Sequence, residues 1–295
     1  MKDGKKITAS REESTSYMNQ TLPMRESFDL IQRDLMIGER MASFYFINGL
    51  NKDDDMLKLM DALLKIKKED MPAGILQFME MAIPYTEVEL IEDFDQVLKN
   101  LFSGVTCLFV DGYEGAIAID CRTYPARSVE EPDKDKSLRG SRDGFVETVV
   151  SNTAMIRRRI RSEHLVMEMQ EVGDSSRTDI AICYMKDRVN KEILCDLRQK
   201  VLSIRTDDLR MNQQSLAECL MKRKWYNPFP KFKFTERPDT AAACLFEGKV
   251  VLLVDNSPSA MILPTSILDV IEEANDYYFP TLTRVYLKSA RGLIS

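Results

Sequence analysis

Apolar and polar residues alternate in two segments near the N-terminus, 28–37 and 40–47. In the second segment Ala42, Phe44 and Phe46 share one side, which is the two-residue period of a pleated strand. The segments are separated by only two residues. The pattern therefore predicts two strands joined by a tight turn.

A helical period replaces the alternation further along the chain. Apolar residues recur every three or four positions in 56–63 and in 94–101, which predicts one buried face on each helix. A longer stripe predicts a helix that begins at Ser141 or Asp143 and reaches about Ser162. The same reasoning predicts further strands at 166–169 and 179–185 and helices at 191–204 and 213–221.

One segment of eleven residues occurs twice, as Leu101–Asp111 and again, 144 positions later, as Leu245–Asp255, with six identical positions. Each copy follows a predicted helix and leads through a turn into a second short strand. Residues 105–110 are apolar on both faces, which is typical of a strand covered on both sides. A fainter third copy stands at 46–49. We expect such similar units to be neighbours in one folded layer.

Together these elements predict an α/β fold of two subdomains. The first subdomain is expected to be discontinuous, over 24–162 and 231–295, and to contain the helix–strand–turn–strand repeat. The second, 163–230, is a small α/β unit inserted between the copies. Residues 1–23 are polar and mixed in charge, so we expect a flexible tail.

Composition narrows the class of protein. The chain has 295 residues, 44% of them hydrophobic, and a formal net charge of −6. Global disorder is therefore not expected, and the acidic balance argues against a nucleic-acid partner. No apolar run approaches the roughly 18 residues that a membrane-spanning helix needs.

The sequence contains little of the chemistry that metal and cofactor sites require. His164 is the only histidine, so we expect no metal and no cofactor. No CxxC pair occurs among the six cysteines, which indicates reduced thiols. Four of the six fall within apolar patterns and are predicted to be buried: Cys107, Cys183, Cys195 and Cys244.

The candidate functional residues lie in two segments. The first, at a predicted helix start, supplies Arg139, Gly140, Arg142 and Gly144. Backbone N–H groups and guanidinium groups there can hold a phosphate or carboxylate. The alternative is an interdomain elbow whose arginines pair with nearby acids, which we favour because the segment matches no known phosphate loop. The second segment supplies Arg237 and Asp239, on either side of a proline suited to the first helical position.

Two other features each allow two interpretations. The run Arg157–Arg159 with Arg161 could bind an anionic partner, but cations also stabilise a helix C-terminus, so a solvated or domain-facing surface is favoured. Asp111 and Asp255 occupy equivalent turns. As paired carboxylates they could perform acid–base chemistry, yet aspartate after a strand more often bonds turn backbone. No nucleotide-binding, nucleophile-elbow or zinc-protease signature is present.

Several of these segments together resemble the A subunits of GerA-type spore germination proteins. The resemblance is carried by 139–147, by Asn152 with the run 156–160, by 235–239 and by 252–258. It covers nearly everything from about residue 24 to 285. Within the family, 225–230 and 255–262 are most similar to a subgroup that acts in sporulation.

The resemblance implies an N-terminal soluble region of two α/β subdomains on the spore-core side of the inner membrane. It also implies a following membrane half and oligomeric, ion-conducting complexes with other A-type protomers and B-type membrane subunits. The chain stops at Leu293-Ile294-Ser295, about where the first membrane helix of the family begins. We therefore expect the soluble region alone.

Two classes of function remain. The first is a non-enzymatic signalling and assembly region of a germination membrane protein, in which the six candidate residues couple the subdomains. The second is a small-molecule-binding module that holds its ligand in a cleft between the subdomains. An enzyme is not expected, since no activated nucleophile or general base is visible.

Overall fold

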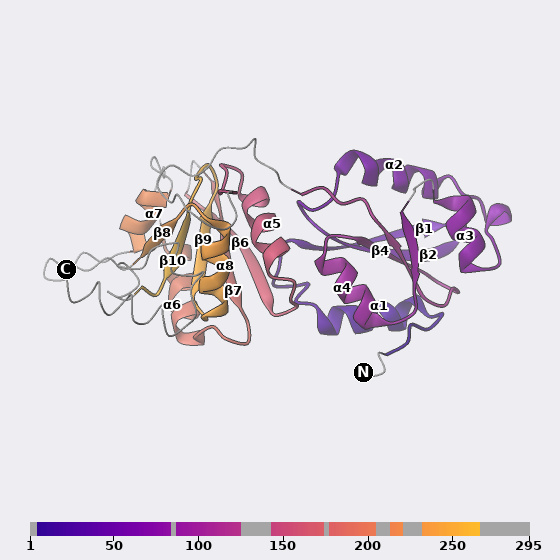
Figure 1. The fold of residues 1–295 in the computed structure, drawn as a ribbon, viewed down its shortest axis with the longest axis horizontal. Coiled ribbons are helices and arrows are strands. Elements are labelled where there is room, and N and C mark those ends of the chain that lie inside the picture. The colour runs from indigo at the N-terminus through magenta and orange to yellow at the C-terminus, as the bar shows by residue number, and fades with distance from the viewer. Residues whose placement is uncertain are drawn as a thin grey trace, which may run out of the picture. The chain divides into compact units, whose positions relative to one another are not determined.

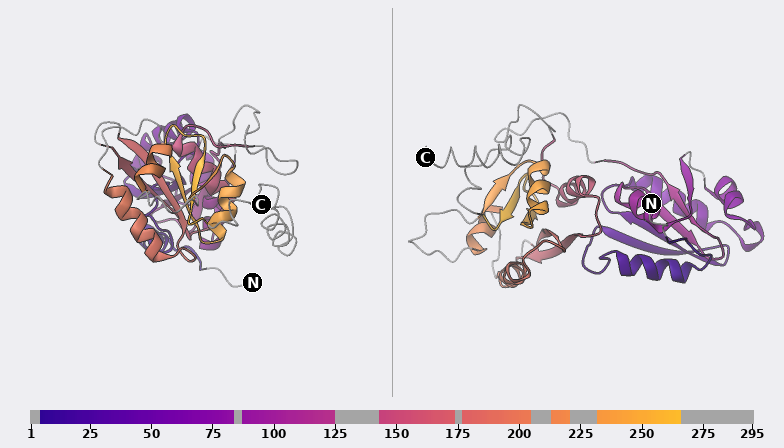
Figure 2. Two further views of the ribbon diagram at one scale, coloured as in Figure 1. Left: turned by 90° about the vertical axis from the view of Figure 1, so that its left-hand side faces the viewer. Right: turned by 60° about the horizontal axis from the view of Figure 1, so that its bottom comes forward.

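The computed structural model describes residues 5–83, 87–124, 143–173, 177–204, 213–220 and 232–265. The chain divides into two compact units. Unit 1 comprises Met1–Pro125 with Arg161–Glu163, and unit 2 comprises Ala126–Ile160 with His164–Ser295. Within the described residues each unit is one five-stranded antiparallel sheet with helices on its faces (Figure 1; Figure 2). This confirms an α/β fold of two subdomains.

Unit 1 is a sheet between two layers of helices, with strand order β1-β2-β4-β5-β3. Phe94 of α4 stacks on Phe109 of β4 on one face, where α1 also lies. Phe78 of α3 and Leu108 belong to the core on the other face, beneath α2 and α3. Strand β4 is buried at every position, as its sequence predicts. The elements are α1 (Arg11–Thr21), β1 (Leu30–Ile37), β2 (Arg40–Ile47), α2 (Asp53–Leu64), the 3-10 helix η1 (Lys68–Asp70), α3 (Ile75–Ala82), β3 (Val88–Ile91), α4 (Phe94–Phe102), β4 (Thr106–Val110) and β5 (Ala116–Ile119).

Unit 2 repeats this plan with strand order β6-β7-β9-β10-β8. Leu194 and Leu197 of α6 and Leu216 of α7 pack with alternate residues of β9 in one core. Helices α5 and α8 lie on the other face and pack against each other (Figure 1). The elements are α5 (Val149–Arg159), β6 (Leu165–Val172), β7 (Thr178–Met185), α6 (Lys191–Leu202), α7 (Gln213–Leu220), β8 (Lys233–Thr235), α8 (Pro238–Phe246), β9 (Val250–Val254) and β10 (Ala260–Leu263).

The two units share one topology, strand for strand. In unit 1 Ala42 pairs with Val110, and in unit 2 Ile180 pairs with Val254. The two valines are the same position of the eleven-residue repeat, so β2 corresponds to β7 and β4 to β9. The order of the remaining strands then matches as well. The repeated segment is thus the most similar part of two copies of one whole fold.

The aspartates that end the repeat have equivalent roles. Oδ1 of Asp111 accepts a hydrogen bond from the Arg11 N–H at 3.2 Å, and Oδ1 of Asp255 accepts one from the Val149 N–H at 3.0 Å. These N–H groups begin α1 and α5, so each carboxylate satisfies a donor that has no partner within its helix. The next position has a positive φ in both copies, which glycine and asparagine tolerate best: Gly112 at 82° and Asn256 at 59°.

This arrangement corrects the predicted domain boundaries. The division into 24–162 with 231–295 and an inserted 163–230 is wrong, because β4 and β9 lie in different sheets. Each copy pairs with the strands of its own unit, and the similarity reflects equivalent positions in two folds. The prediction of a third copy at 46–49 is also wrong. These residues lie at the end of β2, which corresponds to β7 and not to the strands β4 and β9 of the repeat.

Two predicted element boundaries are also wrong. Residues 1–23 are not a tail throughout, because α1 covers the sheet and buries Ser14, Thr15 and Met18. The helix predicted from Ser141 or Asp143 begins at Val149 instead. The described residues before it form no helix, and the Phe145 N–H donates to Glu236 O at 2.8 Å.

Candidate functional site

The structure brings three of the six candidate residues into one region of unit 2. Gly144 is buried in the segment that precedes α5, where the N–H of its neighbour Phe145 donates to the carbonyl of Glu236, the residue just before Arg237. Asp239 stands in the first turn of α8. The other three candidates, Arg139, Gly140 and Arg142, lie outside the described residues, as does the segment 225–230.

Arg237 is almost completely buried, with 1% of its surface exposed. Its guanidinium group donates two hydrogen bonds to Asp239, from Nε to Oδ1 at 3.0 Å and from Nη2 to Oδ2 at 2.5 Å. Such a paired geometry fixes the orientation of both groups. The same carboxylate accepts the N–H of Thr240 at 2.8 Å, which ties the ion pair to the start of α8.

Arg237 stands where helix stability alone would not place a cation. It is the N-cap of α8, at the positive end of the helix dipole, and its side chain makes no capping hydrogen bond. The equivalent residue of unit 1 is Asp93, whose carboxylate accepts the Gln96 N–H at 2.8 Å and caps α4. Where unit 1 has a stabilising cap, unit 2 therefore has an ion pair between a buried arginine and a partly buried aspartate.

The predicted basic run separates into different environments. Arg158 and Arg161 are exposed, as expected for a solvated surface. Arg159 forms an ion pair with Asp143 at 2.5 Å. Arg157 is fully buried and donates from Nη2 to Leu165 O at 3.1 Å, so of the two favoured alternatives the solvated surface is wrong for this residue. Its position, eight residues after Val149, placed it beside the apolar stripe.

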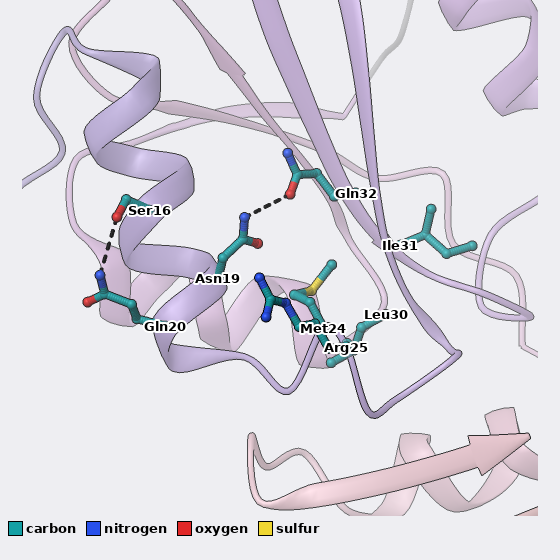
Figure 3. Close-up of a pocket in the computed structure, with 8 residues that line it drawn as sticks. All are labelled: Ser16, Asn19, Gln20, Met24, Arg25, Leu30, Ile31 and Gln32. Carbon is teal, nitrogen blue, oxygen red and sulfur yellow. Dashed lines mark hydrogen bonds between the residues drawn. The ribbon is translucent and has the colours of Figure 1, made fainter.

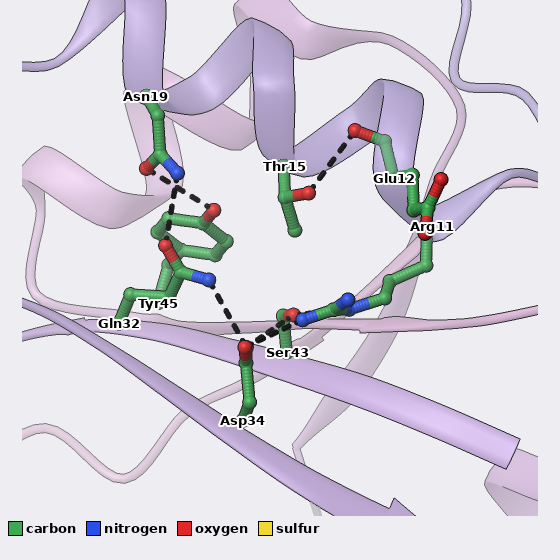
Figure 4. A network of polar contacts seen from close by, with 8 residues as sticks. All are labelled: Arg11, Glu12, Thr15, Asn19, Gln32, Asp34, Ser43 and Tyr45. Carbon is green, nitrogen blue, oxygen red and sulfur yellow. Dashed lines mark hydrogen bonds and ion pairs between the residues drawn. The ribbon is translucent and has the colours of Figure 1, made fainter.

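Unit 1 contains a polar network that the sequence patterns did not predict. Its centre is Asp34, which forms an ion pair with Arg11 at 2.6 Å and accepts from Ser43 Oγ at 2.7 Å (Figure 4). Gln32 Nε2 donates to the same carboxylate at 3.0 Å, and Asn19 Nδ2 donates to Gln32 Oε1 at 3.1 Å. The network ties α1 to the sheet through polar groups.

The network shifts the pKa values of Asp34 and Tyr45. Burial opposes the charge on Asp34, but hydrogen bonds from Ser43, Gln32 and Arg11 outweigh it and hold the pKa of the carboxyl below its ordinary 3.8. Burial raises the pKa of Tyr45, and the charge of Asp34 adds to the effect. Asp34 is therefore ionised and Tyr45 neutral at physiological pH.

We expect the contribution of Asp34 to stability to depend on pH. Because the folded state lowers its pKa, the ionised carboxyl stabilises unit 1 above pH 3.8, and the contribution is lost as the pH falls through the folded-state value. Asp34→Asn should therefore lower the free energy of unfolding near neutral pH and have less effect near pH 3. Urea unfolding of both proteins at the two pH values measures this, and a pH-independent difference would contradict it.

The other titratable groups of the described residues are candidates for one class of site, a metal site. No cluster of three or more His, Cys, Asp or Glu side chains suited to a metal occurs in the described part of the chain. Cys107 is buried, which raises its pKa to about 12. The prediction that Cys195 is buried is wrong, because this residue is exposed, whereas Cys121 is buried as well. His164 is exposed and immediately precedes β6, one of the two edge strands among the described residues of unit 2.

Comparison with solved structures identifies the class of fold. The N-terminal domain of the A subunit of the Bacillus megaterium spore germinant receptor GerK3 superposes with a TM-score of 0.66 at 22% identity. The match covers 90% of this chain and 99% of that domain. The two chains thus share a fold. None of the helices in the described ranges is long and apolar enough to span a membrane.

Comparison of sequences identifies the family. Residues 16–295 match the family described as Bacillus/Clostridium GerA spore germination protein, and the chain belongs to this family. Stage V sporulation protein AF of Bacillus subtilis (strain 168) is 38% identical, over 88% of this chain and 53% of its own length. Spore germination protein GerLA of Bacillus cereus is 30% identical, over 85% and 51%. The chain spans about half the length of these relatives.

Proposed function

We propose that this chain is the soluble signalling and assembly region of an A-subunit-type membrane protein of spore germination. The observation that carries the proposal is the match of the GerA family over residues 16–295, together with a fold shared with nearly all of a germinant-receptor N-terminal domain. The partners would be other A-type protomers and B-type membrane subunits. The region would lie on the core side of the inner spore membrane and contribute to the germinant response or to ion release.

The proposal assigns no catalysis to this region. Its relatives carry the names of sporulation and germination proteins rather than enzymes. We assign the transmission of the germination signal to the junction formed by Arg237, Asp239 and the segment that contains Gly144. Support comes from the difference between the copies, since unit 1 has an ordinary helix cap where unit 2 keeps a buried guanidinium group. A buried, bidentate pair holds one geometry and resists small displacements.

The test is Arg237→Lys in the full-length protein, in spores that lack the native gene. Lysine keeps the charge but loses the planar pair of donors. We expect the rate of germinant-triggered loss of refractility to fall about tenfold or more. This is the effect expected when one charge-assisted hydrogen bond that the signalling step requires is lost. Protein abundance in the spore membrane should stay unchanged.

Arg158→Lys is the matched control, because it makes the same chemical change at an exposed position of the same unit. It should germinate at the parental rate. If Arg237→Lys spores also germinate at the parental rate, the junction does not transmit the signal. If deletion of the whole gene leaves both sporulation and germination unchanged, the wider proposal fails.

A further inference from the structure

A hollow of ≈ 690 Å³ opens in unit 1 between α1 and the start of β1 (Figure 3). Its polar walls come from α1 and from Gln32, and Leu30 contributes apolar surface. The side chain of Ile31 points to the opposite face of the strand, as alternation requires. The volume lies within the range of pockets that hold small ligands or peptide side chains. Ser16, Asn19 and Gln20 form the helical wall.

Among the described residues that line the hollow, Arg25 is the only charged one. Its side chain is exposed, and within the described ranges it makes no hydrogen bond or ion pair. The carboxamides around it are partly engaged with one another, as in the hydrogen bond from Asn19 to Gln32 at 3.1 Å. A guanidinium group in this setting favours a ligand with a carboxylate, which it can hold with two hydrogen bonds.

The hollow adjoins β1, which is an edge strand of the sheet formed by the described residues of unit 1. Strand β1 is the first strand of its sheet, and the Asn48 N–H donates to Asp29 O at 2.8 Å. Hydrogen-bonded pairs alternate along an antiparallel ladder, so the N–H and C=O groups of Leu30 and Gln32 face away from β2. Such an edge can pair with the main chain of an added strand.

Unit 2 closes the same place with one of its own side chains. The helix-capping aspartates align Arg11 with Val149, and therefore Asn19 with Arg157. Arg157 reaches across and donates to Leu165 O, the outward carbonyl at the start of β6. In unit 1 the equivalent carbonyl belongs to Leu30, and the shorter Asn19 leaves it without a side-chain donor from the described part of the chain.

We propose that the hollow and the edge of β1 bind an extended peptide with a free C-terminus. Arg25 precedes β1, so a peptide whose carboxylate reaches Arg25 runs antiparallel to the strand. Its main chain pairs with Leu30 and Gln32, and its last side chain enters the hollow beside Leu30. This site goes beyond the proposed role in germination and does not depend on it.

The test titrates the 295-residue chain with an acetylated tetrapeptide of threonine, valine, threonine and leucine by isothermal calorimetry. The same peptide with a C-terminal amide and free leucine serve as comparison ligands. We expect the free acid to bind with a Kd in roughly the micromolar to millimolar range, and the amide and leucine to bind about tenfold or more weakly. Equal binding of acid and amide, or equal binding of leucine and peptide, overturns the proposal. So does the absence of saturable binding by the free acid.

Two variants locate the site. Arg25→Gln should weaken binding of the free acid about tenfold, whereas Arg33→Gln, on the other face of β1, should not change it. Asn19→Arg should close the hollow as Arg157 does in unit 2, and abolish binding while the circular dichroism spectrum stays native. Equal effects of Arg25→Gln and Arg33→Gln, or tight binding by the Asn19→Arg protein, would assign the peptide to another surface.

Discussion

Asp239→Ala is expected to lower the free energy of unfolding of unit 2 by about 3 kcal/mol, since removal of one partner from a buried ion pair is strongly destabilising. The substitution takes the bidentate carboxylate from Arg237, which stays buried with 1% of its surface exposed. It also removes the acceptor of the Thr240 N–H. Chemical denaturation, monitored by hydrogen exchange of amides in unit 2, measures the loss of stability.

Asp95→Ala is the matched control for this prediction. Asp95 holds the equivalent place in the first turn of α4, but its N-cap neighbour is an aspartate and its own side chain is exposed. Only a favourable interaction with the helix dipole is lost there, so the expected cost is about 0.3–1 kcal/mol. Equal losses of stability for Asp239→Ala and Asp95→Ala would show that the carboxylate of Asp239 does not stabilise the buried guanidinium group of Arg237.

Only those parts of the fold that bury apolar side chains could be predicted from the sequence. Strand β4 was predictable because apolar residues on both faces fit a strand covered on both sides. Helix α1 was missed because it meets the sheet largely through polar groups such as Arg11 and Asn19, which leave no strong apolar stripe. Pattern arguments detect apolar burial, and here the contact is a hydrogen-bonded network.

The position of the repeats could not be predicted for a different reason. Similar segments indicate equivalent environments, and two environments are equivalent either in one sheet or in two copies of a fold. The choice depends on strand order, which rests on pairings such as Ala42 with Val110 that are distant in sequence. The rest of each copy has diverged too far to show the full duplication.

The candidate site was predictable only as a set of residue types. The sequence indicated Arg237 and Asp239 as a charged helix start, but not that the arginine is buried. Burial of a charge depends on what packs over it, which periodicity does not encode. Arg157 was missed for the same reason, although its spacing from Val149 placed it next to the buried face.

Phe44→Ala should destabilise unit 1 by about 3–5 kcal/mol, the usual cost of truncating a buried aromatic side chain. Phe44 is fully buried in the core that α2 and α3 form with the sheet, among Leu59, Phe78 and Leu108. Because that core belongs to one unit only, amide exchange should accelerate in the strands of unit 1. Mass spectrometry of exchanged peptides from each unit measures the difference.

Phe234→Ala makes the same change on β8, where 49% of the side chain surface is exposed. It should alter stability by no more than about 0.5 kcal/mol, as surface substitutions usually do. The comparison tests the duplication directly, because two copies with separate cores should respond separately to a cavity in one of them. Equal acceleration of exchange in β4 and β9 after Phe44→Ala would mean that the two copies unfold as one cooperative body.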